Sequence, residues 1–549
     1  MDDRYEGGDL LVEALLQLGV KQIFSVSGGP INSIYHAAAS HHLPLIHARH
    51  EQGAGFMADA TAKVTGVPGV AAVTLGPATA SMVTNALMAK MSGTPMLIVG
   101  GQGALGSFDR DAEMMADGVR IMTPVTKMAA RVLETRRIPE YVEMAWRAMW
   151  AGRPGPAFLE IPMDVLSAPA ERQAMNASPP PRGSALSAKT ADQISAALER
   201  AERPLLIIGD EAYWELYHDL DPSQLRAAVE RHGLLFTSLR HARGVIDERH
   251  WQCCGPGCAH ANGGLRKAMA EADLIFLLGH HMESDLDFGE PIREDCIIIQ
   301  SYPDPAYHGK GRHADIATTA GVAAIAAFLL ELTPIDNDAL WGQSIAAAWR
   351  AERLEKVSRG GGANQLHPAI AVDVVAETMP DDTIFACGAG NVDFWVDERI
   401  QARAPGTHMK GGLGGGLGAD IPYGLAARLA DPDRPVVVFV GDGGIGYHGF
   451  ELDTAARYGQ PIIVVVLDDR KWGCIAVPQR QAYGAEFEMD LPERDWPGLA
   501  RALGGFGVRA ESEAELREAV KTARRSGKPA IIHVSVGTVL SPFMEQVGH

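Results

Sequence analysis

The sequence predicts an α/β protein built from three doubly wound parallel sheets. Three observations support this fold class. Short, continuously apolar runs alternate along the chain with segments whose apolar residues have helical spacing. Several of these runs end directly in a glycine-rich turn, as strands do at the ligand-binding edge of such sheets. The pattern occurs three times, and 549 residues are enough for about three domains.

The first predicted domain covers residues 1–170. Its opening segment "DLLVEALLQLGV" has apolar residues at helical spacing, and "KQIFSVSGG" follows as a strand that runs into a glycine turn. The segments "GVAAVTLGPATA" and "PMLIVGGQG" repeat the strand-then-glycine pattern. Because these strands are apolar on both faces, we expect a parallel sheet covered by helices on both sides.

Two linker-like stretches separate the remaining domains. Residues 176–189 are rich in Pro and Ser and lead to a second domain, residues 190–335, with strands in "RPLLIIGD", "ADLIFLLGHH" and "DCIIIQSYP". A second linker contains "VSRGGGANQLHP" and leads to a third domain, residues 366–549. Its predicted strands lie in "TIFACGAG", "PVVVFVGDGG", "PIIVVVLDD" and "PAIIHVSVG". The same architecture is therefore expected three times.

Composition excludes several classes of function. No apolar window reaches the ~18 residues of a membrane-spanning helix. The N-terminal residues lack the basic-then-apolar order of a signal peptide, so we expect a cytoplasmic protein with no membrane partner. Asp and Glu total 68 against 49 Lys and Arg, a net charge of −19, which argues against binding to nucleic acid.

The cysteines give little indication of a metal site. Six cysteines in so long a chain do not form a disulfide scaffold. Cys254 and Cys258 are spaced four apart near His260, but no second closely spaced pair follows. We therefore favour small buried thiols over a zinc site.

The strongest functional signal lies between residues 441 and 473. One predicted strand ends at Gly441-Asp442-Gly443-Gly444, and the next ends at Asp468-Asp469. Adjacent parallel strands would bring Asp442 and Asp469 to one edge of the sheet. A Mg²⁺ ion shared with a diphosphate would neutralise both acids, and glycine N–H groups suit a phosphate. The alternative is a glycine turn beside an acidic strand end that binds nothing.

This arrangement resembles the signature of the thiamine-diphosphate (ThDP) enzymes, a superfamily that includes acetolactate synthases, benzaldehyde lyase and 2-oxoacid decarboxylases. The resemblance extends over the whole chain and is closest to benzaldehyde lyase. It implies that Mg²⁺ binds the carboxylates of Asp442 and Asp469 and the backbone carbonyl of Lys471. Two asparagines are commonest where this chain has Asp468 and Asp469, and the resemblance leaves the role of Asp468 open.

A second resemblance concerns the segment "LIHARHEQGAGFMADATAKVTG", in which Glu51 falls on the catalytic glutamate of the family. That glutamate hydrogen-bonds the aminopyrimidine ring and favours the imino tautomer, which removes the proton from the thiazolium carbon. The alternative for Glu51 is an acid on the surface of a helix.

Further cofactor contacts follow from the resemblance alone. The segment "LGPATA" resembles the turn of the pyrimidine domain, with Ala78 in place of a glycine, and "ACGAGNVDFW" resembles a loop over the diphosphate. Leu417 falls where an apolar residue wedges between the two cofactor rings, although an ordinary core leucine is the alternative. The implied cofactor-binding residues are Gly76, Pro77, Gly390, Asn391, Gly416, Leu417, Gly441, Asp442, Gly443, Gly444, Asp469, Trp472 and Gly473.

The predicted substrate pocket is poor in proton donors. Simple decarboxylases of the family carry a His-His pair in the first domain, but "FDRDAEMMADGVRIMTPVTKM" has no histidine. Cys474 and Ile475 stand where those enzymes have a glutamate, and Pro30, after Gly29, stands where some members place a histidine. Glu113 falls where benzaldehyde lyase and acetolactate synthases usually have a glutamine. We expect it to act in catalysis, an exposed loop acid being the alternative.

A histidine pair, His280-His281, lies in the middle domain instead. We expect these two residues to be solvated loop histidines without a catalytic role.

The resemblance predicts a C–C lyase or carboligase that acts on 2-hydroxy ketones and aldehydes through an enamine-like acyl-anion equivalent. The alternatives are a 2-oxoacid decarboxylase, an acetolactate-type synthase or, in another class, a non-catalytic protein with the ThDP fold. FAD is not favoured, because the middle domain shows no dinucleotide fingerprint. Since the family builds each site from two subunits, a homodimer or homotetramer is expected.

Overall fold

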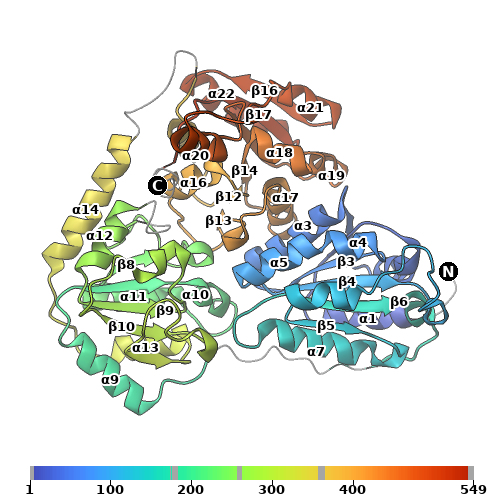
Figure 1. Cartoon of the computed structure of the whole chain (residues 1–549), viewed down its shortest axis with the longest axis horizontal. Helices are drawn as coiled ribbons and strands as arrows, with labels where there is room; N and C mark the ends of the chain where they lie inside the picture. Colours follow the sequence, from blue (N-terminus) through green and yellow to red (C-terminus); the bar gives the residue numbers. More distant parts are fainter. Residues whose placement is uncertain (1–4, 174, 176–182, 256–261, 357–364, 542–549) are drawn as a thin grey trace. The chain divides into compact units, whose positions relative to one another are not determined.

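The computed structural model describes residues 5–541 except 174, 176–182, 256–261 and 357–364. Three parallel sheets with helices between their strands occur in chain order, which confirms the predicted fold class (Figure 1). Each sheet lies within one of the three predicted domain ranges. Much of both predicted linkers falls outside the described residues. None of the helices in the described part combines the length and apolarity needed to cross a bilayer.

The first sheet has the strand order β2-β1-β3-β4-β6-β5. Its strands are β1 (Ile23–Ser25), β2 (Leu45–His47), β3 (Gly69–Val73), β4 (Met96–Gln102), β5 (Met128–Arg131) and β6 (Ala157–Pro162). The helices are α1 (Gly7–Gln17), α2 (Asn32–Ser40), α3 (Glu51–Thr65), α4 (Pro77–Ser81), α5 (Val83–Ser92), α6 (Gly118–Met122), α7 (Ile138–Trp150) and α8 (Met163–Ser167). Strands β3, β4 and β6 are buried along their whole length, as continuous apolar runs predict.

The second sheet has the order β11-β10-β9-β7-β8. Its strands are β7 (Pro204–Ile208), β8 (Leu235–Ser238), β9 (Leu274–Leu278), β10 (Ile297–Ser301) and β11 (Ile316–Thr318). Its helices are α9 (Ala188–Leu198), α10 (Asp210–Glu215), α11 (Pro222–His232), α12 (Gly263–Glu271), α13 (Val322–Glu331) and α14 (Ala339–Lys356). Apolar side chains of both faces form two core layers.

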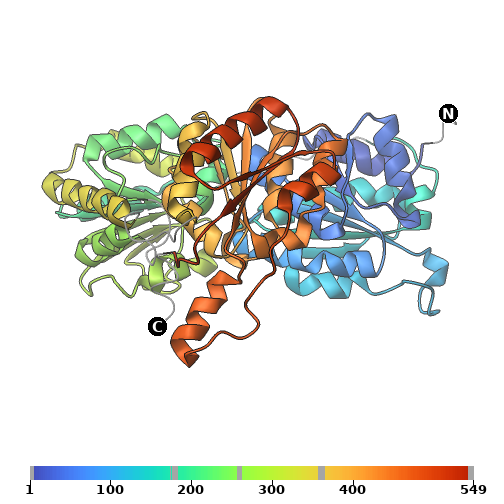
Figure 2. The same cartoon turned by 90° about the horizontal axis from the view of Figure 1, so that it is seen from above.

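The third sheet has the order β13-β12-β14-β15-β17-β16. Its strands are β12 (Ile384–Cys387), β13 (His408–Met409), β14 (Val436–Gly441), β15 (Ile463–Asp468), β16 (Phe506–Ala510) and β17 (Ala530–Ser535). The helices are α15 (Pro368–Thr378), α16 (Asn391–Arg399), α17 (Asp420–Ala430), α18 (Asp442–His448), α19 (Glu451–Arg457), α20 (Gly473–Tyr483), α21 (Trp496–Ala502) and α22 (Glu513–Ser526). Helix α20 and the segment after it project away from this sheet (Figure 2).

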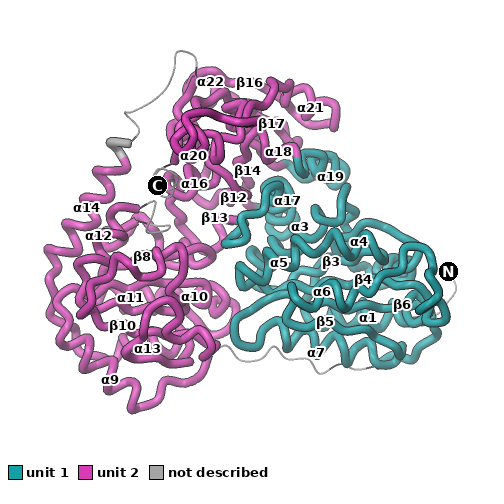
Figure 3. Tube along the Cα trace, in the orientation of Figure 1, with its two compact units in different colours: residues 1–180, 411–433, 447–461 teal, residues 181–410, 434–446, 462–549 magenta. Residues whose placement is uncertain are grey.

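The chain divides into two compact units rather than three (Figure 3). Unit 1 comprises residues 1–180, 411–433 and 447–461, and unit 2 comprises the rest. Helices α17 and α19 therefore belong to the unit of the first sheet, although the sequence places them in the third domain. A buried ion pair fixes α17 there, since Lys63 of α3 binds Asp59 at 2.6 Å and the Tyr423 hydroxyl at 2.9 Å.

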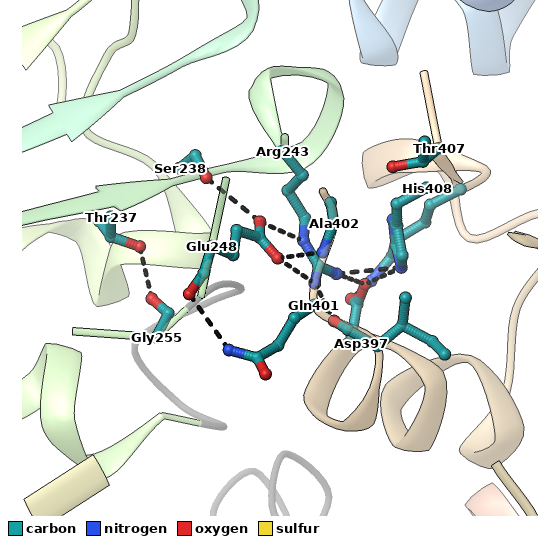
Figure 4. A network of polar contacts seen from close by, with 12 residues as sticks. Thr237, Ser238, Arg243, Glu248, Gly255, Asp397, Gln401, Ala402, Thr407 and His408 are labelled. Carbon is teal, nitrogen blue, oxygen red and sulfur yellow. Dashed lines mark hydrogen bonds and ion pairs between the residues drawn. The ribbon is translucent and has the colours of Figure 1, made fainter. Parts of the chain in front are cut away.

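Unit 2 contains the second and third sheets, and a buried charge network joins them (Figure 4). Arg243, which follows β8, donates to Glu248 from Nε at 2.9 Å and from a terminal nitrogen at 3.0 Å. It also donates to Asp397 of α16 at 3.0 Å. Because Arg243 is 1% exposed, this pairing is shielded from water and ties the two sheets together.

Candidate active site

The acid edge, defined as Asp442, Asp468 and Asp469, lies where two neighbouring strands of unit 2 end. Strands β14 and β15 pair in parallel with Gly441 opposite Leu467, as the sequence predicts. Asp442 begins α18 directly after β14, and Asp468 is the last residue of β15. The carboxylates of this edge are close enough to interact electrostatically.

Electrostatics at the acid edge favour a bound cation. Burial and the neighbouring charges of Asp469 and Asp468 raise the pKa of Asp442 to about 8. Burial is also the main cause that raises the pKa of Asp469 to about 6. Among the described residues, neither carboxylate forms an ion pair with Lys, Arg or His. A buried and a half-buried acid, neither paired with a described protein cation, fit a divalent metal with oxygen ligands.

Protein side chains alone do not complete such a site. The described part of the chain contains no group of three or more His, Cys, Asp or Glu residues in metal-binding geometry. The predicted site, with two carboxylates, a backbone carbonyl and phosphate oxygens as ligands, does not require such a group.

Asp468 has a different environment, which answers the question that the sequence left open. One of its oxygens accepts hydrogen bonds from His533 Nε2 at 2.8 Å and Trp496 Nε1 at 3.3 Å, and the other accepts from the Arg470 N–H at 3.0 Å. Burial alone would raise the pKa of Asp468, but the hydrogen bond and charge of His533 keep it below the usual value. Both oxygens of Asp468 are therefore used within the fold.

The turn after β15 is held by a distant segment. The Lys471 ammonium pairs with Glu486 at 2.7 Å and Asp490 at 2.5 Å, so the side chain is engaged away from its own backbone carbonyl. The Trp472 N–H donates to the Met489 carbonyl at 2.9 Å. These contacts order the predicted metal-binding turn.

Two glycines are required by close approaches at this turn. A Cβ on Gly443 would lie 2.5 Å from the Trp472 ring, and a Cβ on Gly473 would lie 2.5 Å from Asp469 Oδ2. The ring of Trp472 therefore packs directly on the Gly-Asp-Gly turn. This proximity agrees with the placement of Trp472, Gly443 and Gly473 in one site.

The other predicted residues of unit 2 are in varied environments. Gly390 has a φ of +102°, which favours glycine, and begins the turn into α16. The Asn391 amide donates to the Val539 carbonyl at 2.7 Å and its oxygen accepts from the Ser541 N–H, so this side chain binds the chain itself. Burial raises the pKa of the Cys474 thiol to about 11, while Ile475 is 52% exposed. Their contacts with cofactor or substrate stay predictions.

Unit 1 holds the predicted pyrimidine-binding residues. Glu51 is the first residue of α3, and the ring nitrogen of His50 caps this helix by accepting from the Gln52 N–H at 3.0 Å. Gly76 has a φ of +57°, and a Cβ there would lie 1.9 Å from the Met114 carbonyl oxygen. Only glycine fits this turn, and Pro77 begins α4 directly after it.

The segment with Gly416 and Leu417 packs on α5 within unit 1. A Cβ on Gly416 would lie 2.3 Å from the Met88 sulfur, and Leu417 is half-buried. Gly29 and Pro30 form a 3-10 turn beside β4, where a Cβ on Gly101 would lie 3.0 Å from Pro30 Cβ. The wedge role of Leu417 and the pocket roles of Gly29 and Pro30 stay predictions.

Glu113 lies in the loop between β4 and α6 and is exposed in the single chain. Its neighbours Asp111 and Met114 both have positive φ values, which fixes an unusual backbone path around it. Its place in the substrate pocket stays a prediction.

The expectation that the histidine pair is solvated is wrong, whereas its lack of a catalytic role stays a prediction. His280 and His281 are 1% and 5% exposed, so they are buried rather than solvated. His280 Nε2 lies 3.3 Å from a Glu283 oxygen, and the His281 ring lies 4.9 Å from that of Tyr307. The pair follows β9 and lies in a polar cluster at the end of the second sheet. Other segments of the chain cover this cluster, which the local sequence does not show.

Two further outcomes concern the cysteines and a residue without a predicted role. Cys254 is buried and free, as expected, whereas Cys258 and His260 lie outside the described residues. Glu451, in the segment "FELDTA", is almost fully buried and accepts backbone N–H groups directly before Glu51. The segment contains two acids, Glu451 and Asp453, and the local sequence does not show which of them is buried.

Comparison with known proteins identifies the class. Residues 5–121 match "Thiamine pyrophosphate enzyme, N-terminal TPP binding domain", residues 191–330 match the central domain, and residues 388–534 match the C-terminal TPP binding domain. The chain belongs to the thiamine pyrophosphate enzymes. The two TPP binding domains support thiamine diphosphate as the cofactor.

Individual proteins similar to this chain include acetolactate synthases and a 2-hydroxyacyl-CoA lyase. The chain is 29% identical to a probable acetolactate synthase of Mycobacterium bovis, over 96% of this chain and 95% of that protein. It is 27% identical to the catabolic acetolactate synthase of Raoultella terrigena (98% and 96% covered) and to human 2-hydroxyacyl-CoA lyase 2 (97% and 90%). The protein is thus a ThDP-dependent enzyme of the group that contains these carboligases and lyases.

Proposed function

We propose that this protein is a Mg²⁺- and ThDP-dependent C–C lyase or carboligase that cleaves or forms 2-hydroxy ketones with aldehydes as partners. The observation that carries the cofactor assignment is the pair Asp442 and Asp469 at the acid edge, whose pKa values are raised and which have no described protein cation. Asp442, Asp469 and the Lys471 carbonyl would hold the metal, and the metal would hold the diphosphate.

The chain supplies proton transfer and orientation. When bound, ThDP supplies a nucleophilic carbon that adds to a substrate carbonyl and accepts the electron pair released when the neighbouring bond breaks. Glu51, the first residue of α3, would exchange a proton with the pyrimidine ring. Leu417 would bring the two cofactor rings together, which orients the reacting atoms.

The composition of the pocket favours a lyase or carboligase over a simple decarboxylase. The predicted pocket segments around Glu113 and Cys474 contain no histidine, and Pro30 stands where some members of the family have one. Because burial raises the pKa of the Cys474 thiol to about 11, this group is neutral at physiological pH. With few proton donors, these segments would protonate the reacting carbon slowly, which would favour its addition to a carbonyl acceptor. The relatives support two variants of this chemistry, acetolactate-type synthesis and cleavage of a 2-hydroxyacyl thioester.

A substrate panel tests the proposal. Enzyme loaded with ThDP and Mg²⁺ would be incubated with an acyloin, a 2-hydroxyacyl thioester and a 2-oxoacid, and all products would be analysed. We expect aldehyde release from a 2-hydroxy compound, and loss of this activity in Glu51→Gln. Carbon dioxide and free aldehyde from the 2-oxoacid, without cleavage or formation of any 2-hydroxy compound, would instead assign a decarboxylase.

Glu113 provides a sharper test of substrate class. A carboxylate in the pocket would repel a 2-oxoacid by about 4 kcal/mol at ~4 Å and an effective dielectric constant of about 20. Glu113→Gln should therefore shift the activity ratio towards 2-oxoacids. An unchanged ratio would place Glu113 among the exposed loop acids.

We further propose a cytoplasmic homodimer or homotetramer that binds small molecules and neither nucleic acid nor membrane. Sedimentation of active enzyme tests the assembly, and a catalytically competent monomer would contradict it. FAD is not favoured, because the strand ends of the second sheet hold a buried charge cluster. There Arg240 pairs with Asp285 at 2.7 Å and with Glu283. Because these carboxylates pair with Arg240, this cation is already engaged and would not bind a pyrophosphate, so we expect a colourless preparation.

A further inference from the structure

The backbone that leads into Glu51 is held by one distant helix. In unit 1, a single carboxylate oxygen of Glu451 accepts hydrogen bonds from the Arg49 N–H at 3.0 Å and the His50 N–H at 3.2 Å. The second oxygen of Glu451 accepts from the Thr454 hydroxyl at 2.6 Å. Both backbone donors lie directly before α3, whose first residue is Glu51.

Two residues at the end of α19, Arg457 and Tyr458, also bind the segment between β2 and α3. The His47 N–H donates to the Tyr458 hydroxyl at 2.8 Å, and Arg457 donates to the His47 carbonyl at 2.6 Å. Side chains at the end of α19 therefore bind the end of β2, while Glu451 binds the two residues nearest Glu51. The 47–50 connection is thus fixed at both ends by one helix.

The carboxylate of Glu451 occupies a site shaped for it. Glu451 is 1% exposed, and a Cβ on Gly53 would lie only 2.2 Å from its Oε1 atom. A glycine at position 53 is what lets this oxygen approach the start of α3. Burial raises the pKa of Glu451, which shows that its place in the fold is unfavourable for the charged form. The backbone hydrogen bonds offset that cost.

We propose that Glu451 is a positioning residue that acts through the backbone of Arg49 and His50 to set the place of the Glu51 carboxylate. This inference rests on the proposed proton-transfer role of Glu51. A helix whose start is held by a fixed acceptor keeps its first side chain in one position, whereas an unheld connection lets it move. Proton transfer depends steeply on such positions, because misplacement by 1 Å can reduce a rate about 100-fold.

Deuterium exchange at the thiazolium carbon in enzyme loaded with ThDP and Mg²⁺ measures this step directly. Glu451→Ala removes the acceptor and should slow exchange about 10- to 100-fold, while the ThDP dissociation constant changes far less. Glu451→Gln can still present one oxygen to both N–H groups and should keep most of the rate. Glu451→Asp keeps the charge but is one methylene shorter, so it should slow exchange and serves if the alanine variant does not fold.

A matched control separates positioning from general loss of stability. Leu452, the next residue of α19, is fully buried but makes none of these hydrogen bonds. Leu452→Ala should lower the melting temperature and leave the exchange rate of folded holoenzyme unchanged. If Leu452→Ala slows exchange as much as Glu451→Ala, the effect is general softening of α19 and the inference is wrong.

The double variant Glu51→Gln/Glu451→Ala distinguishes the two hypotheses. If Glu451 acts through Glu51, the double variant exchanges no more slowly than Glu51→Gln alone. Additive slowing would show that Glu451 acts independently and would overturn the inference. Exchange at the wild-type rate in Glu51→Gln would remove the proposed role of Glu51 itself. Slow exchange in Glu51→Gln with normal exchange in Glu451→Ala and Glu451→Asp would remove only the positioning role.

Discussion

Two groups of acids in unit 2, one around Lys410 and the other at the acid edge, each contain a carboxylate whose pKa is strongly shifted, Asp397 and Asp442, and the two shifts have opposite directions. Around Asp397, burial would raise the pKa, but Lys410, His408 and Arg243 hold it well below the usual value. At the acid edge, burial and like charges raise the pKa of Asp442 to about 8. The difference is a cation supplied by the protein, which Asp397 has and which Asp442 and Asp469 lack among the described residues.

This difference in pairing indicates a different role for each acid. A buried acid that is paired within the chain stabilises one arrangement of the sheets, and removing its partner is costly. A buried acid without a partner destabilises the empty fold and is retained where a ligand brings the missing charge. The comparison predicts which substitutions change cofactor binding and which change folding.

The largest effect is expected at the metal ligands. Asp442→Ala or Asp469→Ala should weaken ThDP binding in the presence of Mg²⁺ by at least about 100-fold, because the metal loses a direct ligand. The melting temperature of the cofactor-free protein should not fall, since one repelling charge is removed. Titration calorimetry measures the affinity, with the exposed Asp382→Asn as the control. Normal ThDP affinity in both alanine variants would show that Asp442 and Asp469 are not metal ligands.

Arg243→Met should produce the opposite pattern. It leaves Glu248 buried without its cation and should lower the free energy of unfolding by about 3–5 kcal/mol. Denaturant titration of the cofactor-free protein measures this loss. Arg243→Met/Glu248→Gln should recover part of it, because the uncompensated charge is removed as well. A stable single variant with reduced ThDP affinity would show that the network serves the cofactor instead.

The metal-free protein should lose stability as the pH rises. The folded pKa values of Asp442 (about 8) and Asp469 (about 6) lie above the unfolded value of about 3.9. The folded state therefore binds protons more tightly, and its stability falls from about pH 4 to about pH 8. Melting temperatures measured across this range should show the slope, and ThDP with Mg²⁺ should flatten it. An Asp442→Asn variant should have a smaller slope without any ligand.

The smallest effect is expected at the Lys471 side chain. Its ion pairs with Glu486 and Asp490 are near the surface, so Lys471→Met should change the free energy of unfolding by no more than about 1 kcal/mol. ThDP affinity should stay within about threefold, because the predicted metal ligand is the backbone carbonyl. A large loss of ThDP affinity would mean that the ion pairs of Lys471 are needed to keep the metal-binding turn in place.

The sequence by itself determined the strands, their parallel pairing and the meeting of Asp442 with Asp469. Continuous apolar runs predict strands that are buried on both faces of a sheet. A strand–helix–strand unit places the ends of its two strands at the same edge of the sheet. The sequence also predicted glycine turns after these strands. The structure agrees at Gly76 and Gly390, whose positive φ angles favour glycine.

Only the tertiary structure decided the partners of the buried polar groups. Asp468 meets His533, and Glu451 meets the backbone of Arg49 and His50. It also decided that α17 and α19 pack with the first sheet rather than the third. The physical reason is that periodicity along a chain reports whether a residue is buried, whereas the atom that satisfies a buried charge is chosen by packing between segments up to four hundred residues apart.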